Sequence, residues 1–462
     1  MPVAKSNLHI KQYCDIIQYQ MKKRIEMKIS EFFNKDYVDQ ASYDNLRKIA
    51  SLIDGQKNAS RKILYTILEK NVKEKIKVSQ LGSKVAEFAE YLHGNLDGVI
   101  VNLGQDFPGT NNIPLLQKKG NFGTRFSQEA SASRYIYTYG TDKFFEIFKK
   151  EDTAILKHQF FEGQQIEPMF YVPSLPILLI NGSEGVSSGF AQKILPRNPE
   201  KIKQYITNTL SGKSTRGDVF TPYYEGFKGE ITQGDNPAQW LISGVIKRIG
   251  INKVEILEVP IGYDLKSYIS VLDDLEDRKV IQSYRDKSED DKFSFEVTIP
   301  SKSLKEWSDE EVLSQLKLVK KVTENYTVID ENNKIQVFDT AKEIVDKYIS
   351  IKLEYMTKRK EYLIDKLKTE IEFDYSKYLF IKMIVENKLV VAKRKKEQIE
   401  KDLGKVEKIL QKDESYDYLL NMNILSLTEE RMTKLENDIK TKKSDLDSLI
   451  KKTIEQLWSE EI

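Results

Sequence analysis

Tyr135 follows an arginine in the stretch SASRYIYTYG, just after the glycine-bearing turn KKGNFGTR. A tyrosine hydroxyl is a weak nucleophile until nearby cations favour its ionised form, but it can then attack a phosphodiester and conserve the bond energy as a phosphotyrosyl ester. The guanidinium of Arg134 offers a planar fork of donors for the charge that develops on the phosphate oxygens. The pair is therefore a candidate for reversible strand cleavage, although a tyrosine in a chain with 24 of them usually serves as the edge of a core.

A predicted helix with a basic start lies upstream of this pair. In SLIDGQKNASRKILYTIL, residues 51–68, the turn signal Asp54-Gly55 precedes a helix whose apolar residues share one face. Between residues 41 and 80 the chain carries nine Lys or Arg and four acids, a local excess of five positive charges. Such a strip fits phosphate binding, because cationic side chains neutralise phosphates and release counterions, and it also fits a solvated helix face.

The bulk composition limits the classes of protein. A chain of 462 residues with 40% hydrophobic content is long enough for several domains. Its 73 basic and 71 acidic residues leave a net charge of +2, so any DNA-binding surface must be local. The single cysteine, Cys14, excludes a disulfide framework, and the three histidines, His9, His93 and His158, nearly exclude a Cys/His zinc site. With no apolar run of membrane-spanning length and no secretion signal, we expect a cytoplasmic protein.

The composition changes three times along the chain. Up to about residue 195, helical periodicity alternates with glycine-bearing loops, which indicates an irregular, site-bearing domain. From about 198 to 340, short β-branched runs such as NKVEILEVPIG and SFEVTIPSK predict an α+β domain. From 341 onward, Gly404 is the only glycine and no proline follows Pro300, so long helices are predicted.

Two of these helices have the spacing of a coiled coil. In the last helix Lys442 interrupts an apolar 3-4 pattern made by Met432, Leu435, Ile439, Leu446 and Leu449. The SLTE motif at 426–429 predicts a capping box at its start, with Ser426 as the cap. The predicted partner helix carries Val345, Ile349, Leu353, Met356, Leu363, Leu367 and Ile371. The apolar segment between them predicts a helical knob at the far end of an antiparallel pair, and a single helical bundle packed on the body is the alternative.

Five motifs in a fixed order resemble one family. DGQKNASRKIL, YLHGN, NNIPLLQKKGNFGTR, ASASRYIYT and LPILLINGSEGVSSGF occur in the order found in the cleavage-rejoining part of type IIA DNA topoisomerases, a family that includes gyrase, through its A subunit, as well as the matching half of the eukaryotic enzyme. The similarity continues through VEILEVP, NKIQVFDTAKEIVDKYISIKLEYMTKRKEYL and FIKMIVENKLVV, so it covers roughly residues 40–400. Several ordered motifs together are highly specific.

The resemblance implies an α+β multidomain fold in four parts. They are an N-terminal helical arm at residues 1–29, a winged-helix-type DNA-cleavage body at 30–195, an α+β tower domain at 196–340, and a long antiparallel coiled coil with a helical dimerisation gate at 341–462. Two copies are expected to build a gate in which both catalytic tyrosines cut opposite strands, a second duplex passes, and the ends are resealed.

The resemblance also implies roles for single residues. Tyr135 matches the nucleophile that takes a DNA 5′-phosphate, and Arg134 matches its neighbouring phosphate stabiliser. His93 lies in the family's histidine-glycine motif, which helps to hold the scissile backbone. Val186 takes the place of an isoleucine that wedges between base pairs and bends the duplex. The remaining expected DNA contacts are Arg47, Lys57, Arg61, Lys62, Gln105 and Arg125.

Several residues depart from the family pattern. Ala50 replaces the proline of the R-x-I-P motif, and Gln56, Asn58 and Ser60 replace the Leu, Pro and Gln of the DGLKP-x-QR element. Leu92 stands where many relatives have a second histidine, and Asn95 replaces the usual acid. The valine at 186 is a shorter wedge than isoleucine, and we expect it to bend DNA less.

The metal and the nucleotide are expected to come from a partner. The chain carries no ATPase region and no Toprim motif of the EGDSA and DxDxDG types, so it resembles the separate medium subunit of a T-even-like bacteriophage topoisomerase. Its acidic clusters DDLED, SEDDK and KDESYD are far in sequence from Tyr135 and are interpreted as solvated surface. We therefore expect no metal site in this chain, and Mg²⁺ and ATP bound by a Toprim/ATPase large subunit. The other expected partners are double-stranded DNA and a second copy of the chain, in the host cytoplasm if the protein is viral.

Two other classes of protein remain as alternatives. A non-enzymatic coiled-coil DNA-binding scaffold would use the same basic strip without Tyr135. A tyrosine recombinase or nicking enzyme would also form a tyrosine ester, but it should supply its own catalytic histidines and arginines or metal ligands. Paired 5′-linked breaks that reseal are expected only from a topoisomerase.

Overall fold

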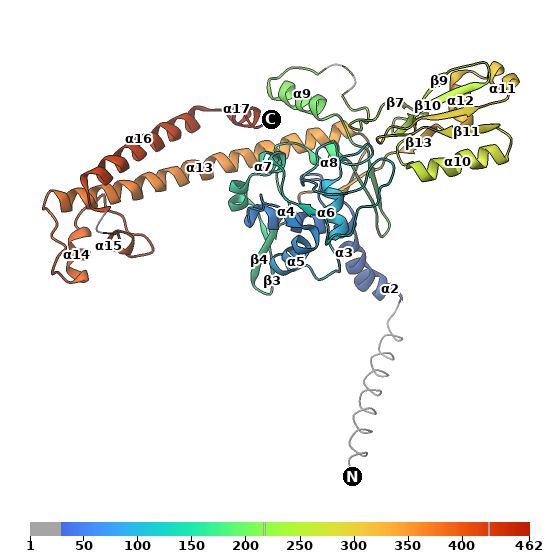
Figure 1. Cartoon of the computed structure of the whole chain (residues 1–462). Coiled ribbons are helices and arrows are strands. Elements are labelled where there is room, and N and C mark those ends of the chain that lie inside the picture. Colours follow the sequence, from blue (N-terminus) through green and yellow to red (C-terminus); the bar gives the residue numbers. More distant parts are fainter. Residues whose placement is uncertain (1–28, 216, 218, 424–425) are drawn as a thin grey trace, which may run out of the picture. The chain divides into compact units, whose positions relative to one another are not determined.

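The computed structural model describes residues 29–462 except 216, 218, 424 and 425, and the predicted N-terminal arm lies outside them apart from Ile29 (Figure 1). The chain forms two compact units. The first contains residues 29–148, 158–202 and 217–346, and the second contains residues 149–157, 203–215 and 347–462.

The first unit mixes helices and short strands. Its helices are α2 (Ile29–Phe32), the π-helix η1 (Phe33–Tyr37), α3 (Val38–Lys48), α4 (Asn58–Glu69), α5 (Val78–Phe88), α6 (Asp97–Gly104), α7 (Asp142–Ile147), α8 (Ile177–Asn181), α10 (Leu265–Asp277), α11 (Ser301–Glu306) and α12 (Asp309–Gln315). Its strands are β1 (Ile76–Lys77), β2 (Tyr137–Thr138), β3 (His158–Phe161), β4 (Gln164–Pro168), β5 (Ser183–Val186), β6 (Ala191–Ile194), β7 (Glu230–Gln233), β8 (Gln239–Ser243), β9 (Val245–Arg248), β10 (Lys253–Glu258), β11 (Ser283–Asp286), β12 (Phe295–Thr298), β13 (Val319–Thr323), β14 (Tyr326–Ile329) and β15 (Ile335–Phe338).

The second unit is helical where it is described. It contains the 3₁₀ helix η2 (Lys150–Ile155), α14 (Lys396–Leu403), α15 (Asp417–Leu420), α16 (Glu429–Lys451) and α17 (Ile454–Ser459). Two helices begin in the first unit and end in the second, α9 (Pro199–Leu210) and α13 (Ala341–Val385).

Helix α4 begins where the sequence predicts it. Gly55 has a φ of +66°, and a β-carbon there would lie 2.5 Å from the backbone nitrogen of Leu178, so the turn before the helix needs glycine. The backbone N–H of Lys57 then donates to the Ser60 hydroxyl at 3.0 Å, which satisfies the first turn. The apolar face of α4 is buried against α5 and α6.

The strand that follows Tyr135 is held from both sides. β2 pairs antiparallel with β1 on one side, and bridges at Leu116–Gly140 and Lys119–Tyr137 join the 116–119 segment on the other. The backbone after Tyr135 is therefore fixed by neighbours that are remote in sequence.

The β5–β6 hairpin is joined to the core of the first unit through β14. An antiparallel bridge links Lys193 to Asn325, and a parallel bridge links Ser51 to Ile329. β14 thus lies between the hairpin and the segment that connects α3 to α4.

The predicted α+β region has its own core. A four-stranded sheet in the order β11-β12-β10-β9 packs with α10 (Figure 1). A second sheet, in the order β13-β8-β7, is formed by two strands that precede β9 in the sequence and one strand that follows α12. Val254 and Ile256 of β10 and Phe295 and Val297 of β12 are fully buried in alternation, which matches the β-branched pattern of the sequence.

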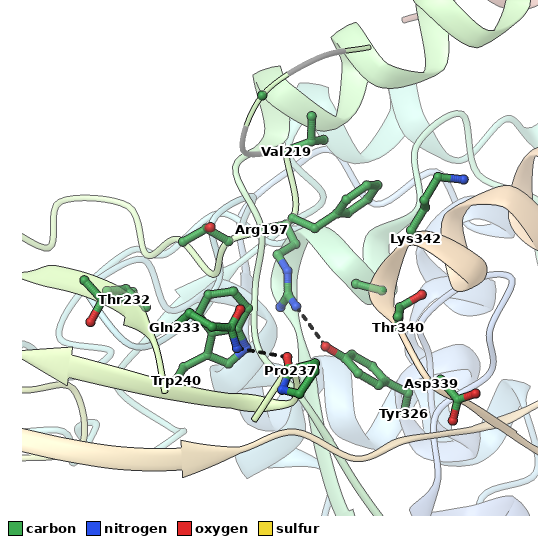
Figure 2. Close-up of a pocket in the computed structure, with 15 residues that line it drawn as sticks. Arg197, Val219, Thr232, Gln233, Pro237, Trp240, Tyr326, Asp339, Thr340 and Lys342 are labelled. Atoms are coloured by element: carbon green, nitrogen blue, oxygen red, sulfur yellow. Dashed lines mark hydrogen bonds between the residues drawn. The ribbon is translucent and has the colours of Figure 1, made fainter. Parts of the chain in front are cut away.

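The carboxylate of Glu324 ties β8 and β14 to the backbone that follows β6. It accepts hydrogen bonds from the Arg197 guanidinium (2.9 and 2.7 Å), the Trp240 indole (2.7 Å), the Tyr326 hydroxyl (2.6 Å) and the Leu195 N–H (2.7 Å). Figure 2 shows the Arg197 guanidinium pointing at Tyr326, beside the ring of Trp240. A buried ion pair with this many hydrogen bonds fixes one geometry.

In the second unit α16 runs antiparallel to α13. Lys360 donates to the carbonyls of Ile450 (3.1 Å) and Lys452 (2.6 Å), whereas Lys442 lies against residues 370–374 further along α13. Lys442 pairs with Glu370 (2.9 Å) and Asp374 (2.8 Å), so the predicted polar interruption is satisfied across the helix pair.

Two details of the helical region differ from the predictions. Helix α16 begins at Glu429 and is capped by Thr428, whose hydroxyl accepts from the N–H of Arg431, so the predicted cap at Ser426 is wrong by two residues. From the sequence, the apolar knob around residues 378–391 has no surface to bury against other than a second copy of the chain, but in the structure its side chains are covered within the chain. Phe380 and Leu389 are buried with residues of the following loops and of α14 and α15 in a core of its own. No helix of the described residues is long and apolar enough to cross a membrane.

Candidate active site

Tyr135 ends a tight turn that projects its ring into solvent. The turn at residues 133–135 is closed by a hydrogen bond from the Tyr135 N–H to the Ala132 carbonyl (2.9 Å). The Tyr135 side chain is 68% exposed, whereas the next residue, Ile136, is buried and its carbonyl accepts from the N–H of Val78 at 3.0 Å. An exposed side chain beside a buried, hydrogen-bonded neighbour is held in a defined position.

Arg134 and Tyr135 contact each other and have no other polar partner among the residues that the structure describes. The guanidinium carbon lies 4.9 Å from the centroid of the Tyr135 ring. Within the part of the chain that the structure describes, neither side chain makes a hydrogen bond or an ion pair. Both polar groups are therefore open to an anionic ligand such as a phosphodiester.

A row of lysines flanks the strand after Tyr135. Lys77 and Lys119 are the cross-strand partners of Tyr137 on its two sides, and the ammonium of Lys75 lies 4.2 Å from the centroid of the Tyr137 ring. Directly opposed residues of antiparallel strands project from the same face, so the cations gather there. Sequence analysis counted Lys75 and Lys77 only as part of the basic strip and did not select Lys119, because the pairing that unites them is between distant segments.

His93 and Arg47 meet at Tyr43. A ring nitrogen of His93 shares a hydrogen bond with the Tyr43 hydroxyl, and the Arg47 guanidinium carbon lies 5.5 Å from the centroid of the Tyr43 ring. Tyr43, on α3, was not selected from the sequence. The structure thus brings together two predicted DNA contacts that are 46 positions apart by their numbers, 47 and 93.

Val186 ends strand β5 and is 74% exposed. Its cross-strand partner is the small Ala191, so the valine projects without a large neighbour on that strand. Lys57 supports the same strand, because its ammonium donates to the Glu184 carbonyl at 2.6 Å. Burial lowers the pKa of Lys57, and the charge of Glu184 opposes that shift.

The predicted phosphate contacts of Arg61 and Lys62 are not supported. Arg61 is buried and donates to both carboxylate oxygens of Asp54 (2.7 and 3.1 Å), and Lys62 is buried against Glu167 (2.9 Å). Burial acts to lower the pKa of Arg61, but the negative charge of Asp54 outweighs it and the pKa is raised. Both cations point inward because the carboxylates beside them are themselves buried.

Arg125 and Gln105 are also used within the protein. Arg125 is 3% exposed and donates to the carbonyls of Val259 (2.9 Å) and Pro260 (3.2 Å) just beyond β10. Gln105 donates to the Phe122 carbonyl at 2.8 Å and so supports the loop before Arg125. Direct DNA contact by Arg125 is therefore not supported, and contact by Gln105 stays a prediction.

The residues around Tyr135 do not fit a divalent cation. Carboxylate and water oxygens are the ligands that Mg²⁺ prefers, whereas Tyr135 follows the cation Arg134, and Lys77 and Lys119 pair with Tyr137 two residues further on. Among residues 29–462, the four masked positions aside, no three His, Cys, Asp or Glu side chains are grouped closely enough to hold a metal. No step is assigned to a metal bound by this chain.

The fold closely matches that of a solved topoisomerase domain. The structure superposes on the crystal structure of the Plasmodium falciparum topoisomerase II DNA-binding, cleavage and re-ligation domain with a TM-score of 0.87 and 32% sequence identity, over 93% of this chain and 63% of that one. The chain thus has the fold of that topoisomerase II domain.

Residues 47–462 match the family of the DNA gyrase/topoisomerase IV A subunits, and the chain belongs to that family. It is 33% identical to the mitochondrial DNA topoisomerase 2 of Dictyostelium discoideum over 95% of this chain and 35% of that protein. It is 31% identical to DNA topoisomerase 2 of Penicillium chrysogenum over 94% of this chain and 29% of that protein. The chain therefore spans about a third of the length of these curated relatives.

The burial of Arg61 leads to a testable prediction. Arg61→Ala should lower the free energy of unfolding of the first unit by roughly 3–5 kcal/mol, because it leaves the Asp54 carboxylate buried without its cation. Urea unfolding in the absence of DNA measures this. Lys84→Ala, at an exposed position on α5, is the control and should change stability by less than about 0.5 kcal/mol. Unchanged stability of Arg61→Ala together with weaker DNA binding would return Arg61 to the DNA interface.

Proposed function

We propose that this chain is the DNA cleavage-rejoining component of an ATP-dependent type IIA DNA topoisomerase, with Tyr135 as nucleophile and Arg134 as phosphate stabiliser. The observation that carries the proposal is the exposed Arg134–Tyr135 pair, which has no other partner among the described residues and lies on a backbone fixed from both sides. Membership of the gyrase/topoisomerase IV family supports it.

The proposed reaction balances without an external oxidant or reductant. The Tyr135 phenolic oxygen bonds to a backbone phosphorus, and the bond from that phosphorus to the 3′ oxygen breaks. The proton lost from the phenol is matched by the proton gained at the 3′ oxygen, and the 5′ phosphate stays on the enzyme. The Arg134 guanidinium donates to the non-bridging oxygens, whose charge grows as the fifth bond forms. Rejoining is the reverse step, so the phosphate bond energy is conserved.

Two basic regions are proposed to hold the duplex. Lys75, Lys77 and Lys119 flank the strand that follows Tyr135, and their charges suit the phosphates beside the scissile bond. The second region consists of Arg47 and His93, which both contact Tyr43 of α3, and of Lys57 at the base of the β5–β6 hairpin. Phosphate contacts of this kind position the DNA and do not select its sequence.

Val186 is proposed to wedge between base pairs. An apolar side chain that is 74% exposed at the end of a strand suits insertion into a base step, which bends the duplex at the expense of stacking.

The partners are part of the proposal. We infer a homodimer through the helical gate of the second unit and a Toprim/ATPase large subunit that binds Mg²⁺ and ATP, both of which type II topoisomerases use. From the sequence resemblance we also propose that the chain contains a winged-helix-type body and a tower domain. We propose from the same resemblance that it corresponds to the separate medium subunit of a T-even-like bacteriophage topoisomerase. Its proposed location is the cytoplasm of the cell or host. The resulting activity is passage of one duplex through a transient double-strand break in another.

Tyr135→Phe should abolish covalent protein–DNA adducts while changing the DNA Kd by less than about fivefold, because one neutral hydrogen bond contributes on the order of 1 kcal/mol. With the partner subunit present, adducts are trapped with detergent and measured on denaturing gels. Tyr137→Phe is the matched control, because its ring stays beside Lys75 and it should still cleave. Adducts from Tyr135→Phe would show that another residue is the nucleophile, and wild-type protein that binds DNA without adducts would favour a non-enzymatic scaffold.

Val186→Ala should reduce the population of bent DNA about tenfold, since it removes two buried carbon groups at about 0.8 kcal/mol each in the wedged state. Val186→Ile should increase that population. Fluorescence energy transfer between dyes at the DNA ends reports the bend. Val337→Ala, which truncates another valine that is 61% exposed, is the control and should bend DNA normally. Normal bending by Val186→Ala would remove the wedge from the site.

The purified chain should bind DNA but form no cleavage adduct with Mg²⁺ until a Toprim-bearing subunit is added, because its cleavage residues are cationic and do not fit a divalent ion. The chain is incubated with supercoiled DNA and Mg²⁺, with and without that subunit, and the reaction is stopped with detergent. Tyr135→Phe with the subunit is the background. Adducts formed by the chain alone would mean that its own residues are sufficient and would overturn the two-component mechanism.

A further inference from the structure

The tip of the β5–β6 hairpin is fastened to helix α3 by a single carboxylate. Oδ2 of Asp44 accepts hydrogen bonds from the Ser187 hydroxyl (3.0 Å), the Ser188 hydroxyl (3.0 Å) and the Ser188 N–H (3.1 Å). Oδ1 of the same carboxylate pairs with the ammonium of Lys48, one turn along α3, at 2.9 Å. We call Asp44, Ser187 and Ser188 the hairpin latch.

The base of the hairpin is held independently of the latch. Gly185 packs so closely on the end of α3 that a β-carbon there would lie 2.1 Å from the Lys48 carbonyl oxygen. The buried Gln192 side chain accepts from the Ala50 N–H at 3.0 Å and donates to the Thr327 carbonyl at 2.7 Å. These contacts fix the strands up to Val186, but they do not reach the turn at 187–190 that follows it.

The latch acts on the turn itself. The turn closes with a hydrogen bond from the Ser187 N–H to the Phe190 carbonyl (2.9 Å) and contains Gly189 at a φ of +78°. A short glycine-bearing turn has several accessible backbone states, and a carboxylate that takes three donors from two adjacent residues selects one of them. Val186 immediately precedes this turn.

We propose that Asp44 is the positioning residue of the wedge: it holds the hairpin tip in the conformation that presents Val186 to DNA and joins that tip to the helix that carries Arg47. This rests on the proposed function of Val186. Asp44 itself carries the wrong charge for a phosphate contact, so its contribution is made before DNA binds, through the conformation of the turn.

The charge of the latch is stable over the working range of pH. The hydrogen bond from Lys48 is the main cause that lowers the pKa of Asp44 to about 2, with Ser188 and Ser187 adding to it and burial opposing it. A carboxylate with a lowered pKa contributes its interaction above its ordinary value, and that contribution is lost only as the pH falls toward 2. Titration of Asp44 should therefore cause no change in the extent of DNA bending as the pH is varied near neutrality.

The test measures DNA bending by energy transfer with the full chain and its Toprim-bearing subunit, in the Tyr135→Phe background so that cleavage does not interfere. Asp44→Ala should reduce the bent population roughly tenfold, since ordering the backbone of even one residue on binding costs about that factor. The DNA Kd at a site too short to bend should stay within about twofold, because the phosphate contacts remain. Asp39→Ala, which removes an exposed acid from the same helix, is the control for charge and should bend DNA normally.

Removal of the donors provides a second, independent variant. Ser187→Ala with Ser188→Ala removes the two hydroxyl donors and leaves the Ser188 N–H, so it should reproduce most of the loss. Combining it with Asp44→Ala should add nothing to the loss caused by Asp44→Ala alone, because both changes break one latch. Normal bending by Asp44→Ala, or additive losses in the combination, would overturn the proposal. The wedge is judged separately: reduced bending by Val186→Ala with normal bending by Asp44→Ala rejects only the latch, whereas normal bending by Val186→Ala rejects the wedge on which the latch depends.

Discussion

The carboxylate of Asp54 has no access to solvent, and the region that carries the candidate site depends on it. It accepts hydrogen bonds from the Arg61 side chain (2.7 and 3.1 Å) and from the N–H groups of Gln56 (2.9 Å) and Tyr171 (3.0 Å). A carboxylate left unpaired at this depth costs several kcal/mol, so Arg61 must stay inside. The start of α4 is thereby fixed, and with it the position from which Lys57 reaches the β5–β6 hairpin.

Buried acceptors of this kind separate six cations of the first unit into two groups. Arg61, Lys62 and Arg125 have buried acceptors, and they hold α4, β4 and the backbone after β10 in place. Arg134 has no polar partner among the described residues, and Lys77 and Lys119 lie opposite Tyr137 on a small sheet, with Lys119 exposed and Lys77 half-buried. A cation that is already paired gains little from a phosphate, whereas one paired only with water gains the release of counterions. The second group is therefore the one suited to DNA.

The sequence predicted elements better than it predicted the direction of single side chains. The Asp54-Gly55 turn, α4 and the antiparallel helices were predictable because their signals are local and periodic. The inward orientation of Arg61 was not predictable, because the start of a basic helix has the same amino-acid sequence whether its charged side chains face DNA or a buried acid. A count of charges within one segment does not detect partners such as Glu167, which lies 105 positions from Lys62. The domain boundaries predicted at 195 and 340 stay predictions.

One departure from the family pattern became interpretable only with the fold. A proline at position 50 would lack the N–H that here donates to Gln192, 142 positions away. Alanine in place of proline at position 50 therefore replaces a rigid backbone angle with a hydrogen bond to strand β6 of the hairpin, and no local pattern in the sequence connects the two residues.

The backbone presents Tyr135 and Val186 in the same way. Each is an exposed side chain next to a residue that is buried: Ile136 after the tyrosine and Gly185 before the valine. Each lies at the boundary between a short strand and a tight turn. A side chain that must react or insert loses less entropy on meeting its target if the backbone beneath it is already ordered, and burying the adjacent residue achieves that order without covering the functional group. Because the two neighbours are anchored to different parts of the first unit, the start of α5 and the end of α3, the placement of the nucleophile and the placement of the wedge can be altered separately by mutation.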